Sequence, residues 1–201
     1  MKLYYAPGAC SMAPHIVAQA AGIDLELIKV DIPAKKTEHG DDYWQVNPKG
    51  YVPALMLDDG DVLTEVGVIC QYLADQKPES GLIAPAGSRQ RYHQQESLNF
   101  VATEVHKQIG ALFNPALTPE MRQVQTQVIK RRLTALERLL EGKQYLNGEE
   151  FSVADAYLFV PLHWTNRMKF DLADFPNIQA YRDRLAQYPA VRAAMQAEGL
   201  G

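Results

Sequence analysis

The first thirty residues of the chain alternate between strand and helix patterns. Lys2–Tyr5 is an apolar and aromatic run typical of a strand, and a Pro-Gly pair interrupts it. A helical pattern then covers residues 11–22, and residues 25–30 alternate again like a strand. Two strands joined by a helix over so short a stretch form a βαβ unit, in which the two strands lie parallel. The chain must therefore begin with an α/β domain.

The next fifty residues complete a small mixed domain. Residues 31–47 are polar and are expected to be irregular or short-helical. Two apolar runs, 52–57 and 62–64, flank an Asp-Gly turn and predict a hairpin. A helical pattern over 65–76 follows. The predicted order is β-α-β-β-β-α over residues 1–77.

The second part of the chain is expected to be entirely helical. Residues 78–87 contain repeated Pro and Gly and predict a linker. From residue 88 to 201 every pattern is helical. Expected helices are a long one over 89–113 capped by Ser88, one opened by Thr118-Pro119, one after Ser152, and two between Pro176 and Ala197. The expected fold class is α/β plus all-α, with a helical bundle following the mixed domain.

Composition excludes several classes of partner. The net charge is -4, which disfavours nucleic acid and anionic membranes as partners. No apolar stretch has the length of a membrane span, and the first residues lack the pattern of a secretory signal. Only two cysteines occur, far apart, so that a disulfide framework is not indicated. We expect a protein of the reducing cytoplasm.

Cys10 is the residue that most strongly suggests chemistry. It lies at the turn between the first strand and the first helix, next to Ser11, a candidate N-cap, while Gly22 is expected to end that helix. Unpaired backbone N–H groups and the helix dipole favour a thiolate there, with a pKa below the usual value of about 8.5. The alternative is a small buried apolar residue, which is the preferred interpretation of Cys70. Position alone leaves the two interpretations of Cys10 about even.

Beyond these local patterns, the chain resembles a cytosolic glutathione transferase of the bacterial beta class. The resemblance spans nearly the whole chain at constant spacing. It rests on residues 1–5, 7–11, 46–55, 63–65, 71–75, 103–107 and 151–159.

The resemblance implies a fold and an activity. The fold would be a thioredoxin-like N-terminal domain joined to a helical C-terminal domain, assembled as a homodimer. The activity would be conjugation of the glutathione thiolate to small hydrophobic electrophiles, without a metal. Monothiol disulfide exchange through Cys10, glutathione-dependent dehalogenation and a non-catalytic binding protein are the alternatives.

The resemblance also assigns site residues in the first domain. A cis Val52-Pro53 bond would present backbone groups to glutathione as an added strand. Glu65 would bind the γ-glutamyl ammonium, with the backbone of the next residue on its carboxylate. That next residue is Val66, where the family usually has Ser or Gly. The remaining glutathione-binding residues implied here are Cys10, Ser11 and Lys35.

The resemblance extends the site into the second domain. Asn99, Thr103 and His106 share one helix face by their spacing and would close the glutathione site, with Glu104 and Val105 in the same stretch. His106 would be catalytic together with Cys10, because it can stabilise a thiolate. Trp164 would belong to the electrophile pocket.

Two polar residues at the start of the helix expected after Ser152 are predicted to be structural. Ser152 and Asp155 have the spacing of a capping box. Asp155 is therefore expected to stabilise the helix start rather than to act as a catalytic acid. The histidines outside this site show no metal-ligand spacing, and no metal site is expected.

Overall fold

The computed structural model describes residues 1–200, which form two compact units. The first unit contains Met1–Ile83 and the chain from Tyr188 onward, and the second is Ala84–Gln187. From the sequence, residues 88–201 were expected to form one domain. The structure instead groups the last helix, α8 (Pro189–Ala197), with the first unit, because that helix packs on helix α1 (Met12–Ala21).

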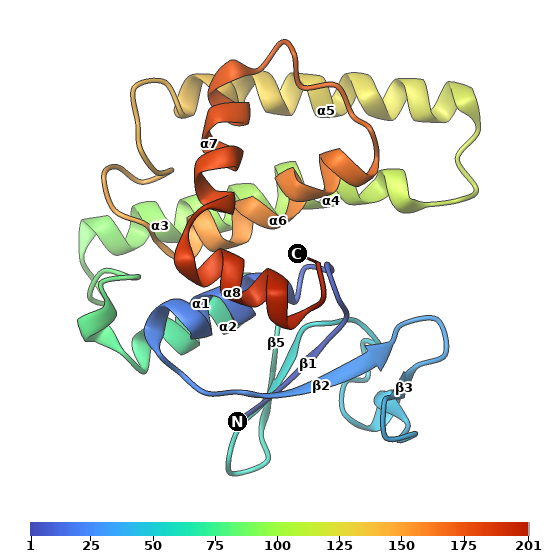
Figure 1. Ribbon diagram of the computed structural model, residues 1–201, viewed down its shortest axis with the longest axis vertical. Helices are drawn as coiled ribbons and strands as arrows, with labels where there is room; N and C mark the ends of the chain where they lie inside the picture. Colours follow the sequence, from blue (N-terminus) through green and yellow to red (C-terminus); the bar gives the residue numbers. More distant parts are fainter. Residues whose placement is uncertain (201) are drawn as a thin grey trace. The chain divides into compact units, whose positions relative to one another are not determined.

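The first unit contains a five-stranded mixed sheet in the order β3-β2-β1-β4-β5 (Figure 1). Its strands are β1 (Lys2–Tyr5), β2 (Glu26–Asp31), β3 (Lys36–Thr37), β4 (Ala54–Met56) and β5 (Val62–Thr64). Strand β1 pairs with β2 in parallel, and the other pairs are antiparallel. The predicted βαβ unit and hairpin are confirmed. The polar stretch after β2 holds the short strand β3 and a 3-10 turn, η1 (Tyr43–Gln45).

Three helices pack together in this unit. They are α1 (Met12–Ala21), α2 (Val66–Asp75) and α8 (Pro189–Ala197), and α1 contacts both of the others. A further 3-10 turn, η2 (Pro78–Ser80), follows α2. Gly22 ends α1 in the left-handed conformation with φ 66°, as expected, because glycine adopts positive φ without a Cβ clash.

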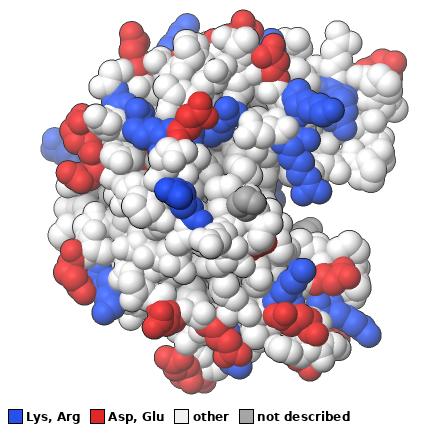
Figure 2. Space-filling view, in the orientation of Figure 1, with Lys and Arg blue, Asp and Glu red and all other residues white. Residues whose placement is uncertain are grey.

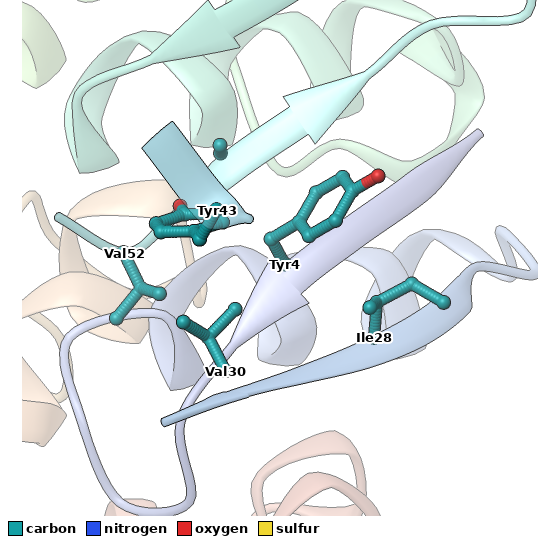
Figure 3. Packing of buried hydrophobic residues seen from close by; sticks show 6 residues of the cluster. Tyr4, Ile28, Val30, Tyr43 and Val52 are labelled. Atoms are coloured by element: carbon teal, nitrogen blue, oxygen red, sulfur yellow. The ribbon is translucent and has the colours of Figure 1, made fainter. Parts of the chain in front are cut away.

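One face of the sheet carries a small aromatic and aliphatic cluster (Figure 3). The rings of Tyr4 and Tyr43 lie 5.7 Å apart, and Val52 is part of the same cluster. The other members are Ile28, Val30 and Ala54. This packing holds in place the segment that leads into β4. Much of the candidate site lies on or beside that segment.

The second unit is helical. Its elements are α3 (Arg89–Phe100), η3 (Val101–His106), α4 (Lys107–Gly110), η4 (Ala111–Phe113), α5 (Pro119–Leu139), α6 (Val153–Arg167) and α7 (Pro176–Ala186). Helix α6 contacts α3, η3, α4 and α7. The predicted caps are confirmed for α3 and α5, because the hydroxyls of Ser88 and Thr118 accept from backbone N–H groups in the first turn.

The predicted long helix over 89–113 is continuous but not uniform. Its middle, η3, is π-helical, and η4 at its end is a 3-10 turn. The helix face that Asn99, Thr103 and His106 would share by α-helical spacing therefore does not continue through this segment. π-helical turns occur frequently at functional sites.

On the face drawn in Figure 2, acidic and basic side chains are interspersed. Among the helices of residues 1–200, none is both long enough and apolar enough to cross a membrane.

Candidate functional site

Cys10 lies in the loop between β1 and α1, two residues before the helix begins. Its side chain is half-buried, and its thiol donates a hydrogen bond to the carbonyl oxygen of Val52 over 3.2 Å. The Val52-Pro53 peptide bond is cis, as expected. The structure therefore brings the candidate nucleophile directly beside the candidate peptide-binding segment.

Ser11 occupies the N-cap position of α1, as expected, but its side chain makes no cap hydrogen bond. The fully buried hydroxyl instead accepts from the Ala6 N–H over 3.1 Å and lies 3.3 Å from the Ala6 carbonyl oxygen. It holds the start of the Cys10 loop against the helix.

The segment before Val52 is held by two buried polar side chains. The Tyr43 hydroxyl and the Asn47 amide each donate to the Tyr51 carbonyl oxygen over 2.7 Å. Burial raises the pKa of Tyr43 to about 12, and the Asn47 hydrogen bond acts in the opposite direction. Sequence reasoning missed both residues, because their role depends on where the loop returns to the sheet.

Lys35 reaches the same loop. Its ammonium donates to the Gly50 carbonyl oxygen over 2.7 Å and lies 5.5 Å from the Trp44 ring centroid and 5.7 Å from that of Tyr51. Gly50 has φ 68°, and a Cβ there would lie 2.6 Å from the Trp44 ring. Glycine is required at this position both by the backbone and by the close approach of Trp44.

Glu65 stands at the N-cap of α2 in an uncommon conformation. Its φ is 71°, a strained value for a residue with a Cβ, and such strain clusters at functional sites. The Glu65 side chain is 68% exposed, and Lys49 donates to its carboxylate over 2.8 Å and to the Thr64 hydroxyl over 2.9 Å. Val66, the first residue of α2, is buried. Sequence reasoning missed Lys49, whose partner is 16 residues away.

In the second unit, His106 ends the π-helical segment and faces α6. Its Nδ1 lies 2.7 Å from the Tyr157 hydroxyl, and its ring meets that of Trp164 edge-on with centroids 5.1 Å apart. The Phe113 ring also meets Trp164 edge-on, with centroids 5.3 Å apart. Trp164 is almost fully buried in this aromatic cluster.

The other residues expected around His106 are spread over η3 and the end of α3. Asn99 and Thr103 are exposed and adjacent, because the Thr103 hydroxyl donates to the Asn99 carbonyl oxygen over 3.1 Å. Glu104 forms an ion pair with Arg132 at 2.6 Å, a partner that sequence reasoning did not identify. Val105 is buried.

Asp155 is fully buried and accepts four hydrogen bonds. The donors are the backbone N–H and hydroxyl of Ser152, the backbone N–H of Leu146 and the Tyr181 hydroxyl, at 2.5–2.8 Å. Burial raises the pKa of Asp155, and these hydrogen bonds oppose the rise. The reciprocal capping box predicted for the start of α6 is present.

Cys70 is completely buried in α2, and burial raises the pKa of its thiol. Neither cysteine forms a disulfide. Within residues 1–200, no group of three or more His, Cys, Asp or Glu side chains is arranged to hold a metal ion.

The candidate residues thus form two sets of contacts, one within each unit. In the first unit, Cys10 contacts Val52, while Lys35 and Glu65 are tied to the preceding loop through Gly50 and Lys49. In the second unit, His106 contacts Trp164, and Asn99 contacts Thr103.

Family models cover most of this chain. The model described as the N-terminal domain of glutathione S-transferase matches residues 3–81, and the one described as its C-terminal domain matches residues 100–189. The chain is 44% identical to glutathione S-transferase GstA of Escherichia coli O157:H7, over the full length of both. The chain belongs to the glutathione S-transferase family. The sequence-based expectations of a glutathione transferase and of a thioredoxin-like domain followed by a helical one are confirmed.

Two solved structures place the likeness within this family. A bacterial beta class glutathione S-transferase of Sphingomonas chungbukensis is 45% identical, with a TM-score of 0.96 and full coverage of both chains. A sphingomonad glutathione S-transferase complexed with glutathione is 46% identical, with a TM-score of 0.95 and full coverage of both chains. The expected resemblance to the beta class is confirmed.

Proposed function

We propose that this glutathione transferase attacks hydrophobic electrophiles with a glutathione thiolate bound beside Cys10. The observation that carries the proposal is the 3.2 Å contact between the Cys10 sulfur and the Val52 carbonyl oxygen. It places a thiol against the backbone of the segment that a tripeptide would line as an added strand. The enzyme would align the thiolate and exclude water from the attack.

The proposed glutathione site uses the residues that surround this contact. Val52 and Pro53 offer the peptide edge, and the exposed carboxylate of Glu65 offers an acceptor for the γ-glutamyl ammonium. Lys35 supplies positive charge for the glycyl carboxylate, since Gly50, Trp44 and Tyr51 hold its ammonium in place. The backbone N–H of Val66 lies at a helix N-terminus, which favours an anion.

The proposed contribution of the second unit is the stretch from Asn99 to His106, with Thr103, Glu104 and Val105. His106 would stabilise the thiolate by donating a hydrogen bond. Trp164, in contact with His106, would form part of the wall of the electrophile pocket.

The state of the enzyme in the cell is also part of the proposal. We expect a homodimer in the cytoplasm that binds glutathione and small hydrophobic electrophiles without a metal, a nucleic acid or a membrane. The net charge of -4 supports the last two expectations. Light scattering coupled to size exclusion, giving a mass of twice 22.5 kDa, would support the dimer, and a monomeric mass would contradict it.

The decisive experiment measures glutathione affinity by calorimetry in Glu65→Gln. Loss of a charge-assisted hydrogen bond worth about 1.5–3 kcal/mol should raise Kd by roughly 10- to 150-fold. Turnover of an aryl halide at low glutathione should fall in parallel.

The matched control is Glu26→Gln. Glu26 also forms an exposed ion pair, with Lys2 at 3.2 Å, but it lies at the start of β2. Its replacement should leave glutathione affinity unchanged. Equal affinity in wild type and Glu65→Gln would show that glutathione binds elsewhere.

A further inference from the structure

The imidazole of His106 has a hydroxyl partner that fixes one of its two nitrogens. Nδ1 lies 2.7 Å from the Tyr157 hydroxyl oxygen. Of these two groups the phenolic hydroxyl is the better donor, because its oxygen lone pair is delocalised into the ring, and a bare imidazole nitrogen is the better acceptor. The pairing therefore favours donation by the tyrosine to an unprotonated Nδ1.

We propose that Tyr157 is a positioning residue that holds His106 as the neutral imidazole with its proton on Nε2. In a neutral imidazole one nitrogen donates and the other accepts. If Nδ1 accepts from Tyr157, the ring proton must be on Nε2. The hydrogen bond to one nitrogen thus decides what the other nitrogen can do.

Both rings are packed against neighbouring groups. Tyr157 is 3% exposed and lies in the first turns of α6, close to the capping box of Ser152 and Asp155. The edge of Trp164 meets the His106 ring at an interplanar angle of 70°. A Cβ added at Gly110 would lie 3.6 Å from Trp164 and 3.7 Å from His106, so that both rings lie over this glycine.

The consequence for catalysis rests on the proposed function of His106. An Nε2–H group can donate to an anionic sulfur without any change of protonation. An imidazole with a bare Nε2 would instead present a lone pair to the sulfur and repel the thiolate. Tyr157 would thus make His106 a hydrogen-bond donor in the reaction.

The tautomer of His106 can be measured directly by NMR. Two-dimensional ¹H–¹⁵N multiple-bond spectra of the ¹⁵N-labelled full chain distinguish a protonated from an unprotonated ring nitrogen. The His106 signals are identified by their loss in His106→Gln. We expect the wild type to show a protonated Nε2 and an unprotonated Nδ1, and a proton on Nδ1 would overturn the proposal without any variant.

Tyr157→Phe removes the donor while keeping the ring. We expect its His106 signals to shift toward a mixture of tautomers, while Tyr92→Phe, which removes an exposed hydroxyl on α3, leaves them unchanged. An unchanged tautomer in folded Tyr157→Phe would overturn the proposal.

Kinetics separates this proposal from the proposed function. Tyr157→Phe should lower kcat for aryl-halide conjugation about three- to tenfold, the loss expected for one neutral hydrogen bond, with little change in KM for glutathione. The effect should disappear in the His106→Gln background. A changed tautomer with unchanged kcat would support the positioning role of Tyr157 and contradict the catalytic role of His106.

Discussion

The carboxylate of Glu198 lies 2.9 Å from Nδ1 of His15, and both side chains are buried in the first unit. The other carboxylate oxygen accepts from the Gly8 backbone N–H, also over 2.9 Å. Gly8 stands two residues before Cys10, and His15 lies in α1. Glu198 therefore holds the Cys10 loop in place through Gly8 and helix α1 in place through His15.

Replacing Glu198 by Gln should destabilise this arrangement. A glutamine amide carries no charge and has one acceptor oxygen instead of two, so that the charge-assisted contacts to Gly8 and His15 cannot both be kept. We expect a loss of about 1–3 kcal/mol in the free energy of unfolding, measured in urea. Glu79→Gln, which changes an exposed side chain, should be neutral, and a Glu198→Gln as stable as wild type would contradict this role.

Tyr43 should make stability depend on alkaline pH. Because burial raises its pKa from 10.0 to about 12, the folded protein keeps the proton over a range in which the unfolded chain loses it. The contribution of the protonated Tyr43 to the free energy of unfolding is fully present below pH 10 and is lost as the pH rises toward 12.

Tyr43→Phe tests this directly through unfolding midpoints measured between pH 8 and 12. At neutral pH the variant should be less stable by about 1 kcal/mol, because it lacks the hydrogen bond to Tyr51. Its stability should fall less steeply above pH 10 than that of wild type. Parallel curves for the two proteins would contradict the prediction.

Local signals in the sequence were sufficient for much of the fold. Thr118-Pro119 and Ser152-x-x-Asp155 predicted helix starts, because caps depend on residues within one turn. The alternation around β1 and β2 predicted a parallel pair, since a short βαβ unit allows little else. The sequence also predicted a cis Val52-Pro53, but only through resemblance to a family.

Features that depend on contacts distant in sequence could not be predicted. Ser11 has the residue type of a cap, yet Ala6 offers its hydroxyl two partners. The pairing of Lys49 with Glu65 and that of His106 with Tyr157 join separate elements. The buried residues of the π-helical segment η3, Val101 and Val105, are four apart as in an ordinary α-helix, so that no local pattern marks the segment.

Asp155 should matter for stability and not for turnover. Asp155→Ala leaves the N–H groups of Ser152 and Leu146 and the Tyr181 hydroxyl without their acceptor. We expect a loss of at least about 2 kcal/mol, the upper end for a helix cap, in the free energy of unfolding. Turnover per folded molecule should stay near wild type. Glu150→Ala, at an exposed neighbouring position, is the control, and a stable but inactive Asp155→Ala would disprove the structural interpretation.

Lys49 should compete with glutathione for Glu65. Its ammonium already occupies the carboxylate that the γ-glutamyl ammonium would use. An exposed ion pair is worth about 0–1 kcal/mol, so Lys49→Met should tighten glutathione binding by up to about fivefold in calorimetry. Lys2→Met, which breaks the comparable pair with Glu26, should have no effect. Weaker binding in Lys49→Met would mean that this lysine holds the ligand instead.

Cys10 should form a mixed disulfide with glutathione, and Cys70 should not. Attack of the Cys10 thiolate on oxidised glutathione forms one sulfur–sulfur bond and releases one glutathione thiolate. Cys70 is completely buried, with a raised pKa, and so supplies little thiolate. Mass spectrometry after exposure to oxidised glutathione should therefore find one adduct, on Cys10, and Cys70→Ala should give the same result.

The fate of activity in Cys10→Ala separates disulfide exchange from conjugation. Exchange needs the protein sulfur and should be abolished. Conjugation uses the sulfur of glutathione, which can still bind along Val52 and at Glu65, so aryl-halide turnover should survive in part. The Cys10 thiol donates to the Val52 carbonyl oxygen, and its removal frees that acceptor for a backbone N–H of bound glutathione. An adduct on Cys70 alone, or complete loss of conjugation in a folded Cys10→Ala, would show that this division of roles is wrong.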